Sequence, residues 1–237
     1  MLLDPTVLIQ NLELETPLIG FYDAPDTAPF DPLCGPKPGK RACVFAFYNA
    51  WLNDETLHLT ADNYGCGGAG SWLWDQRTRT REEYIRFLVD DEGLKASHEI
   101  MGEWIDHINP YHPEHDHLLI GPLNPGQEQF LKTVTFLVNP DQLSLLLTGA
   151  QYHATPSDPP PTIAPFGSGC MQLVTAFPDL DLPQSLIGAT DLAMRQYLPP
   201  DMLAFTVTRP MFDRLCALDE SSFFHKPFLK RLRKARS

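Results

Sequence analysis

Two proline-rich segments set the strongest limit on how this chain can fold. Residues 24–40 hold five prolines and two glycines, and residues 154–169 are similarly rich in residues that break regular structure. Proline fixes the backbone angle φ and lacks an N–H donor, so neither segment suits the interior of a helix or a central strand. We therefore expect both segments to be surface loops that connect regular elements.

The remainder of the chain alternates between helix-like and strand-like patterns. Apolar residues at three- and four-residue steps indicate helices, and short runs of β-formers indicate strands. The expected helices cover 5–14, 42–52, 80–90, 94–108, 140–147, 170–177, 192–198 and 210–218, and the expected strands cover 17–23, 55–62, 117–123, 132–138, 185–191 and 202–208. This mixture predicts an α+β (mixed α/β) fold with short strands in a mixed sheet and flanking helices.

We expect one globular domain over residues 1–222, followed by a basic tail over 223–237. No internal repeat of 20–50 residues is present. The net charge of the chain is −12, but its last twelve residues carry six basic side chains and no acid, so the rest carries −18. An acidic body repels phosphate groups, which disfavours nucleic acid and anionic lipid as partners. The tail either folds back on the acidic body, stays solvated, or acts as a weak electrostatic tether.

The chain has neither the basic start of a secretory signal nor an apolar run of the roughly 20 residues that span a bilayer. Its five cysteines are an odd number, which favours reduced thiols over disulfides. These features predict a cytoplasmic protein with no membrane contact. Nothing in them indicates a protein partner or an oligomeric state.

The stretch LTADNYGCGGAGSWLW, residues 59–74, sets one thiol, Cys66, among four glycines. The glycines formally match G-x-G-x-x-G, but the acid expected about 20 residues further on should end a strand, whereas Asp90 ends a helical pattern. Two interpretations remain open. The glycines fit a cramped backbone around Cys66, or they let a ligand or metal approach that backbone closely. On the second interpretation Gly65, Gly67 and Gly68 are candidate ligand-binding residues.

Two further cysteines, Cys43 and Cys170, are placed like Cys66 at or just before the start of an expected helix. Helix N-termini stabilise thiolates through the helix dipole and free N–H groups, so each thiol is expected to be more reactive or more ligating than a core thiol. The alternative for each is a small buried hydrophobe, since free cysteine is among the most buried residue types.

Two other groups of polar residues are weaker candidates. The segment HPEHDH at 112–117 offers nitrogen and oxygen ligands for a divalent ion, although its spacing matches no known zinc motif and a solvated loop is the simpler interpretation. Asp191 and Arg195 are spaced as a helical ion pair, with Arg195 as a possible anion-binding residue. G-x-S-x-G, the P-loop motif and H-E-x-x-H do not occur in the chain.

Several segments together resemble one protein family. They are FYD in the first expected strand, Cys43, the glycine-flanked Cys66, IGPL, FLVNPDQ, GSGC at 167–170 and GATDLAMRQYLPPDMLAFTV. This set resembles the ArCR-type domain of unknown function, family 169, over about residues 5–218. The resemblance brings no activity. It implies that Cys43, Cys66 and Cys170 form one candidate site, with Asp191 and Arg195 as neighbours.

Three functional hypotheses follow. In the first, Cys43, Cys66 and Cys170 line a pocket that binds a soft metal or an iron–sulfur cluster in a redox or ligand-binding role. In the second, the pocket binds an anionic metabolite without metal, cradled by the glycines and met by Arg195. In the third, Cys66 is the nucleophile of a cysteine-dependent enzyme, with His58 or His153 as its base. The sequence leaves open whether the protein is an enzyme and whether it holds a cofactor; a cofactor, if any, would be a thiolate-ligated metal or cluster.

Overall fold

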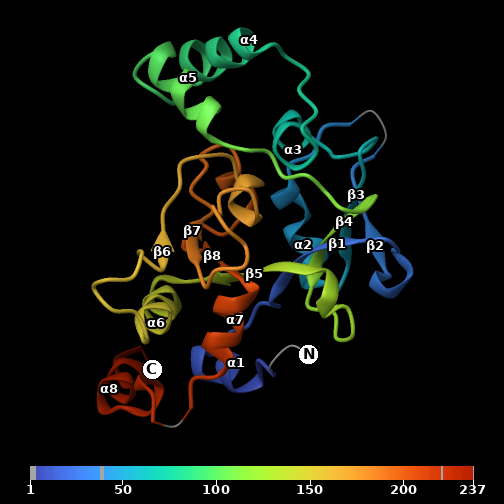
Figure 1. Ribbon diagram of the computed structural model, residues 1–237. Helices are drawn as coiled ribbons and strands as arrows, with labels where there is room; N and C mark the ends of the chain where they lie inside the picture. The colour runs from blue at the N-terminus through green and yellow to red at the C-terminus, as the bar shows by residue number, and fades with distance from the viewer. Residues whose placement is uncertain (1–3, 38–39, 220, 237) are drawn as a thin grey trace.

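The computed structural model describes residues 4–37, 40–219 and 221–236, and it is built around one mixed β-sheet (Figure 1). The strand order is β2-β3-β4-β1-β5-β8-β7-β6. Neighbouring strands run antiparallel, except that β2 lies parallel to β3 and β6 lies parallel to β7. The strands are β1 (Ile19–Ala24), β2 (Leu33–Cys34), β3 (Thr56–Leu59), β4 (His117–Pro122), β5 (Leu131–Val138), β6 (Thr162–Ile163), β7 (Ser185–Gly188) and β8 (Leu203–Thr208).

The central strands are buried on both faces of the sheet, which is why they read as continuous apolar runs. All six residues of β1 are buried. Along this strand Tyr22 belongs to the hydrophobic core on one face, and Phe21 belongs to the core on the other face.

Four α-helices cover the first face: α1 (Thr6–Leu12), α6 (Pro140–Gln151), α7 (Arg209–Cys216) and α8 (Pro227–Arg236). The start of α6 is encoded locally, because Asn139 and Gln142 form a capping box and Pro140 occupies the first turn. This segment was predicted as a helix, and it is one.

The second face carries shorter elements, and the cavity lined by the three candidate cysteines lies on this side. They are the α-helices α2 (Tyr48–Leu52) and α3 (Gly67–Leu73) and the 3-10 turns η2 (Val44–Phe47), η5 (Met171–Leu173) and η6 (Arg195–Tyr197). The other 3-10 turns are η1 (Ala28–Phe30), η4 (Glu128–Phe130) and η7 (Phe223–His225).

A helical cap, residues 81–107, projects beyond α3 and away from the sheet (Figure 1). It consists of α4 (Arg81–Arg86), one π-helical turn η3 (Phe87–Asp91) and α5 (His98–His107). The cap has a small hydrophobic core of its own, formed by Ile85, Leu88, Met101 and Ile105. The cap therefore packs as a separate helical unit beyond α3.

The two halves of the sheet repeat one connectivity. From the centre outwards the order is β1-β4-β3-β2 on one side and β5-β8-β7-β6 on the other, with matching parallel and antiparallel pairs. The antiparallel pair β1–β5 joins the halves at the centre. As a result, the connection from β2 to β3 and the connection from β6 to β7 occupy equivalent places in the two halves.

The predicted α+β class and single domain are confirmed, but several local predictions were wrong. The two proline-rich segments contain the short edge strands β2 and β6, since backbone pairing with β3 and β7 captures two residues in each. The helix expected at 170–177 is only the single 3-10 turn η5. The Leu173 carbonyl accepts a hydrogen bond from Thr133 Oγ1 (2.6 Å) on β5. In a longer helix this carbonyl would instead accept a hydrogen bond from a backbone N–H further along the chain. The helix expected at 42–52 is split into η2 and α2.

The basic C-terminal segment folds back onto the acidic body. Leu229 of α8 is buried, Arg233 forms an ion pair with Glu13 (2.8 Å), and Arg236 forms one with Asp141 (2.6 Å). Of the alternatives open from the sequence, this is the self-contact. The boundary between residues 222 and 223 stays a prediction, and the terminal residue Ser237 lies outside the described residues. Among the described helices, none has the length and apolar character needed to cross a membrane.

Candidate functional site

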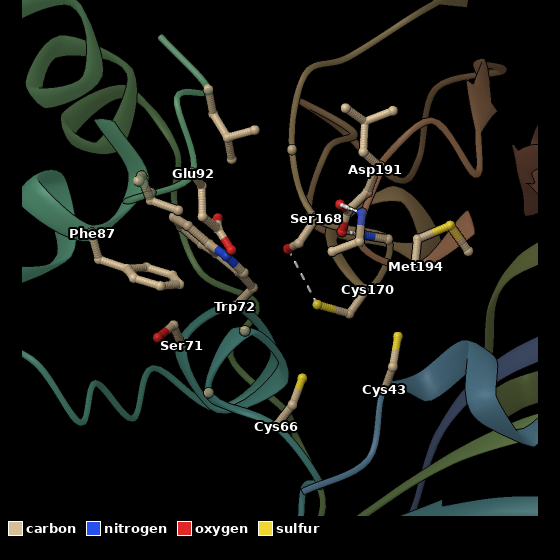
Figure 2. Close-up of a pocket in the computed structure, with 18 of the residues that line it drawn as sticks. Cys43, Cys66, Ser71, Trp72, Phe87, Glu92, Ser168, Cys170, Asp191 and Met194 are labelled. Atoms are coloured by element: carbon tan, nitrogen blue, oxygen red, sulfur yellow. Dashed lines mark hydrogen bonds between the residues drawn. The ribbon is translucent and has the colours of Figure 1, made fainter. Parts of the chain in front are cut away.

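A cavity of about 820 Å³ lies on the second face of the sheet, below the helical cap (Figure 2). Cys43, Cys66 and Cys170 all contribute to its lining, although they are far apart in the sequence. In Figure 2 their three sulfur atoms point into the same space from three separate segments. The sequence-predicted cysteines thus line one cavity; whether they bind anything stays a prediction.

Cys43 and Cys170 reach the cavity from equivalent connections in the two halves of the sheet. Cys43 precedes η2 after strand β2, and Cys170 precedes η5 after strand β6. The glycines before Cys170 are needed for close packing. Gly167 has a φ of 150°, and a Cβ on Gly169 would lie 2.9 Å from the ring of Phe45. The GSGC segment therefore packs closely against Phe45 of η2, at a point where a residue larger than glycine would not fit.

Cys66 is the N-cap residue of α3, and its sulfur accepts a hydrogen bond from Ala69 N (3.5 Å). The prediction that Cys66 directly precedes a helix is confirmed, and Gly67 and Gly68 belong to the first turn of this helix. Both line the cavity, whereas Gly65 is not among its lining residues. Gly65 has a φ of 85°, and a Cβ there would lie 2.5 Å from the Ala42 carbonyl oxygen, so its role is to turn the chain.

Gly68 leaves an open space between two of the thiols. A Cβ placed on Gly68 would lie 3.8 Å from Cys66 Sγ, from Cys170 Sγ and from Ser168 Oγ. The two sulfurs are therefore within twice that distance of each other. The Ser168 hydroxyl also lies 3.4 Å from Cys170 Sγ. A methyl group added at Gly68 would therefore contact both sulfurs and the hydroxyl.

Two of the three thiols are held in the protonated form more strongly than a position at a helix start would predict. Burial raises the pKa of Cys43 to about 11. Burial, and then the nearby Cys66, also raise the pKa of Cys170 above its ordinary value. The expectation that these positions favour the thiolate was wrong for Cys43 and Cys170. Their short 3-10 turns provide little dipole, and loss of hydration disfavours the charged form.

Asp191 lines the cavity, whereas Arg195 is not among its lining residues. The Asp191 carboxylate accepts hydrogen bonds from Gly169 N (3.2 Å) and Ala193 N (2.9 Å). The Arg195 guanidinium donates to the carbonyl oxygens of Ala189, Met202, Pro199 and Pro200. The predicted helical ion pair is therefore wrong, because Arg195 holds together the backbone before β8. Its guanidinium is engaged by this chain instead of facing a bound anion.

The opposite wall of the cavity is aromatic and comes mainly from α3 and the cap. Trp72 and Phe87 face the cysteines across the cavity in Figure 2. Trp104 packs edge-on against Trp72 (ring centroids 5.6 Å apart) and against Phe166 (5.0 Å). In the sequence, several of these residues are recognisable only as apolar positions of helices, because their spacing does not indicate which cavity they line.

Charged residues also line the cavity. Glu92 of the cap and Asp191 of the core lie on opposite sides (Figure 2). Burial, and then the charge of Asp191, raise the pKa of Glu92. Three arginines, Arg41, Arg77 and Arg79, complete the charged lining. The run RTRTR at 77–81 in an otherwise acidic body was the available signal for two of them.

The histidines considered from the sequence lie elsewhere. In the HPEHDH segment, His115 contacts the buried carboxylate of Asp23 (3.1 Å), and His117 begins β4. His58 Nε2 lies 3.0 Å from His117 Nδ1, so His58 pairs with a histidine and not with Cys66. None of the described residues that line the cavity is a histidine, so neither His58 nor His153 lies there as the predicted base for Cys66.

A ready-made metal centre is likewise absent from the described part of the chain. It contains no group of three or more histidine, cysteine, aspartate or glutamate side chains arranged to hold a metal ion. Neither the HPEHDH segment nor the three cavity cysteines form such a group.

Comparisons with known proteins agree with the resemblance drawn from the sequence. A family model described as uncharacterised ArCR, domain of unknown function 169, matches residues 7–217. A search of curated proteins and a search of solved structures each returned no match. The chain therefore belongs to the family of uncharacterised ArCR proteins, domain of unknown function 169.

Proposed function

We propose that this protein binds a small organic molecule in the cavity between Cys43, Cys66 and Cys170 and the aromatic wall formed mainly by α3 and the cap. The observation that carries the proposal is the composition of this one cavity. Thiols from three separate segments form one side, and the rings of Trp72 and Phe87 form the other.

The size and lining of the cavity support an organic ligand. A volume of about 820 Å³ is within the range of small-molecule sites. Such sites combine apolar walls with a few polar groups that fix orientation. Here the polar groups include Ser168 and Asp191, and the raised pKa values of Cys43 and Cys170 keep these thiols neutral near pH 7. Neutral thiols are compatible with an uncharged or weakly polar part of a ligand.

The proposal is tested by protection of the thiols from alkylation. A metabolite library is incubated with the protein, iodoacetamide is added, and mass spectrometry measures the modification of each cysteine. A true ligand should slow the modification of Cys66 and Cys43. Cys34 is the matched control, because burial raises its pKa to about 11, as for Cys43, and it is not among the cavity residues.

The proposal also requires that the protecting compound raise the melting temperature, since binding to the folded state stabilises it. If no compound protects Cys66 and Cys43 more than Cys34, small-molecule binding at this cavity is excluded. Equal protection of all three cysteines would indicate general stabilisation and would also count against the proposal.

A soft metal or an iron–sulfur cluster is the second candidate for the same cavity. It is favoured by one observation, the direction of the three sulfurs toward a common space (Figure 2). The side chains would have to rotate to form a coordination sphere, and their protons would be released on binding. Addition of Cd²⁺ to reduced protein, followed by thiolate-to-metal absorbance, tests this. A signal lost in Cys66→Ser supports the metal, and a signal equal in both proteins excludes it.

A further inference from the structure

We infer that the ligand of this cavity is an aromatic anion: a flat conjugated body that lies against the aromatic wall and carries an acidic group that meets the arginines of the rim. This inference rests on the proposed function and narrows it to a chemical class. It is carried by three features, namely the aromatic wall, the exposed ring at its edge and the local charge.

The aromatic wall is continuous over four side chains. Trp72 lies between Tyr84 (ring centroids 6.3 Å apart) and Trp104 (5.6 Å), and Trp104 contacts Phe166 (5.0 Å). These rings come from α3, α4, α5 and the loop before Cys170, and all of them line the cavity. A flat ring system makes more favourable contacts with such a wall than an aliphatic chain does, because paired aromatic rings contribute binding free energy beyond that of burying apolar surface.

The edge of this wall remains open to solvent. Phe166 is 37% exposed although it lines the cavity, and Leu192, which also lines it, is 80% exposed. Large apolar side chains that are both exposed and part of a cavity lining indicate surface that a bound molecule covers. The exposed ring of Phe166 places the conjugated part of the ligand near the mouth as well as inside.

The charge of the cavity differs from that of the rest of the protein. The chain outside its last twelve residues has a net charge of −18, yet three arginines and only two carboxylates line this cavity. The guanidinium of Arg79 lies 4.0 Å from the ring centroid of Phe87, and the ammonium of Lys95 lies 4.0 Å from that of Phe166. Cations therefore lie directly beside the aromatic wall, where the acidic group of an aromatic ligand would be placed.

The acidic residues of the cavity are accounted for separately. Two backbone N–H groups donate to the Asp191 carboxylate. Glu92 faces Asp191 across the cavity. The pKa of Glu92 is raised first by burial and then by repulsion from the negative charge of Asp191. Since Arg41, Arg77 and Arg79 are all exposed, the positive side of the cavity is its rim. An anion would therefore enter with its charged group at the rim and its ring inside.

The test uses three probes of related size: anthracene carboxylate, anthracene methanol and decanoate. The first has both the ring and the charge, the second has only the ring, and the third has only the charge. Calorimetry with the full-length protein measures each affinity, and thiol protection of Cys66 against Cys34 locates the binding. Anthracene carboxylate should bind at least about tenfold more tightly than either partial probe, because it gains both kinds of contact.

Two cavity variants and two controls sharpen this test. Phe166→Leu removes an exposed ring, and the double change Arg77→Gln with Arg79→Gln removes rim charge without removing hydrogen-bonding capacity. Each change should weaken the binding affinity for anthracene carboxylate by about three- to tenfold. The arginine effect should shrink in high salt, since exposed charges are screened. Phe228→Leu and Arg231→Gln on α8, which are exposed and far from the cavity lining, should leave the affinity unchanged.

The outcomes separate this inference from the proposed function. If decanoate or anthracene methanol protects Cys66 as well as anthracene carboxylate does, or if the arginine variant binds equally, the aromatic-anion class is wrong while a ligand site remains. If anthracene carboxylate gives no protection but a compound of another class does, the inference is again overturned. If no probe and no library compound protects Cys66, both fail.

Discussion

Replacing Gly68 by alanine probes the arrangement of the thiols directly. The added methyl group would lie 3.8 Å from Cys66 Sγ, Cys170 Sγ and Ser168 Oγ, which is ordinary van der Waals contact. Gly68 is in the first turn of α3, where alanine is a better helix former by up to about 1 kcal/mol. The three new contacts contribute about 0.1–0.2 kcal/mol each. Gly68→Ala should therefore stabilise the protein by about 0.5–1 kcal/mol.

Two neighbouring glycines supply matched controls of opposite sign. A Cβ on Gly70 would lie 2.4 Å from the ring of Tyr64, so Gly70→Ala should cost about 1–3 kcal/mol through overpacking. Gly65→Ala combines a left-handed backbone with a 2.5 Å approach to the Ala42 carbonyl oxygen and should cost about 2 kcal/mol or more. All three changes add the same methyl group, so composition effects cancel.

Thermal and urea unfolding give the stability order, and thiol alkylation gives the effect on the cavity. For a chain of this length, the Gly68→Ala gain corresponds to a rise of about 1–4 °C in melting temperature. The methyl group should also slow the alkylation of Cys66 and Cys170 without changing that of Cys34. A loss of more than about 1 kcal/mol in Gly68→Ala, comparable with Gly70→Ala, would show that the space between the thiols is filled and that the described cavity geometry is wrong.

Four further predictions concern three single residues. The alkylation rate of Cys43 should rise about tenfold per pH unit from pH 7 and level off near its pKa of about 11, because the thiolate is the nucleophile; a plateau near pH 8 would contradict the raised pKa. The same shift means that the folded state holds this proton more tightly than the unfolded chain, so urea unfolding should show stability falling as pH rises from about 9 toward 11, less steeply in Cys43→Ala. Arg195→Met should lower the free energy of unfolding by about 2 kcal/mol or more, since several backbone carbonyls lose a charged donor, and wild-type stability would refute that role. Asp23→Ala should cost about 3 kcal/mol in urea unfolding, because the Tyr111 hydroxyl and two backbone N–H groups lose their buried acceptor; a cost below that of an exposed aspartate would refute the network.

Local patterns were sufficient for the long elements. Strand β5 is a continuous run of β-formers buried on both faces, and α6 begins at a capping box that involves only neighbours in sequence. The same patterns were insufficient where a distant segment decides the local conformation. Strands β2 and β6 have two residues each, and they exist only because β3 and β7 pair with them. Residues 170–177 have a helix-like composition but form only one turn, since Thr133 on β5 donates a hydrogen bond to the Leu173 carbonyl.

The candidate site shows the same division. The sequence by itself determined the family and singled out Cys43, Cys66 and Cys170, because glycine-flanked thiols and motif order are local properties. Only the tertiary structure decided that these thiols share one cavity, that Arg195 is occupied by backbone carbonyls, and that the opposite wall is aromatic. The physical reason is the sheet topology. Two equivalent connections, each after a short edge strand, place Cys43 and Cys170 in one cavity, and no spacing along the chain records that equivalence.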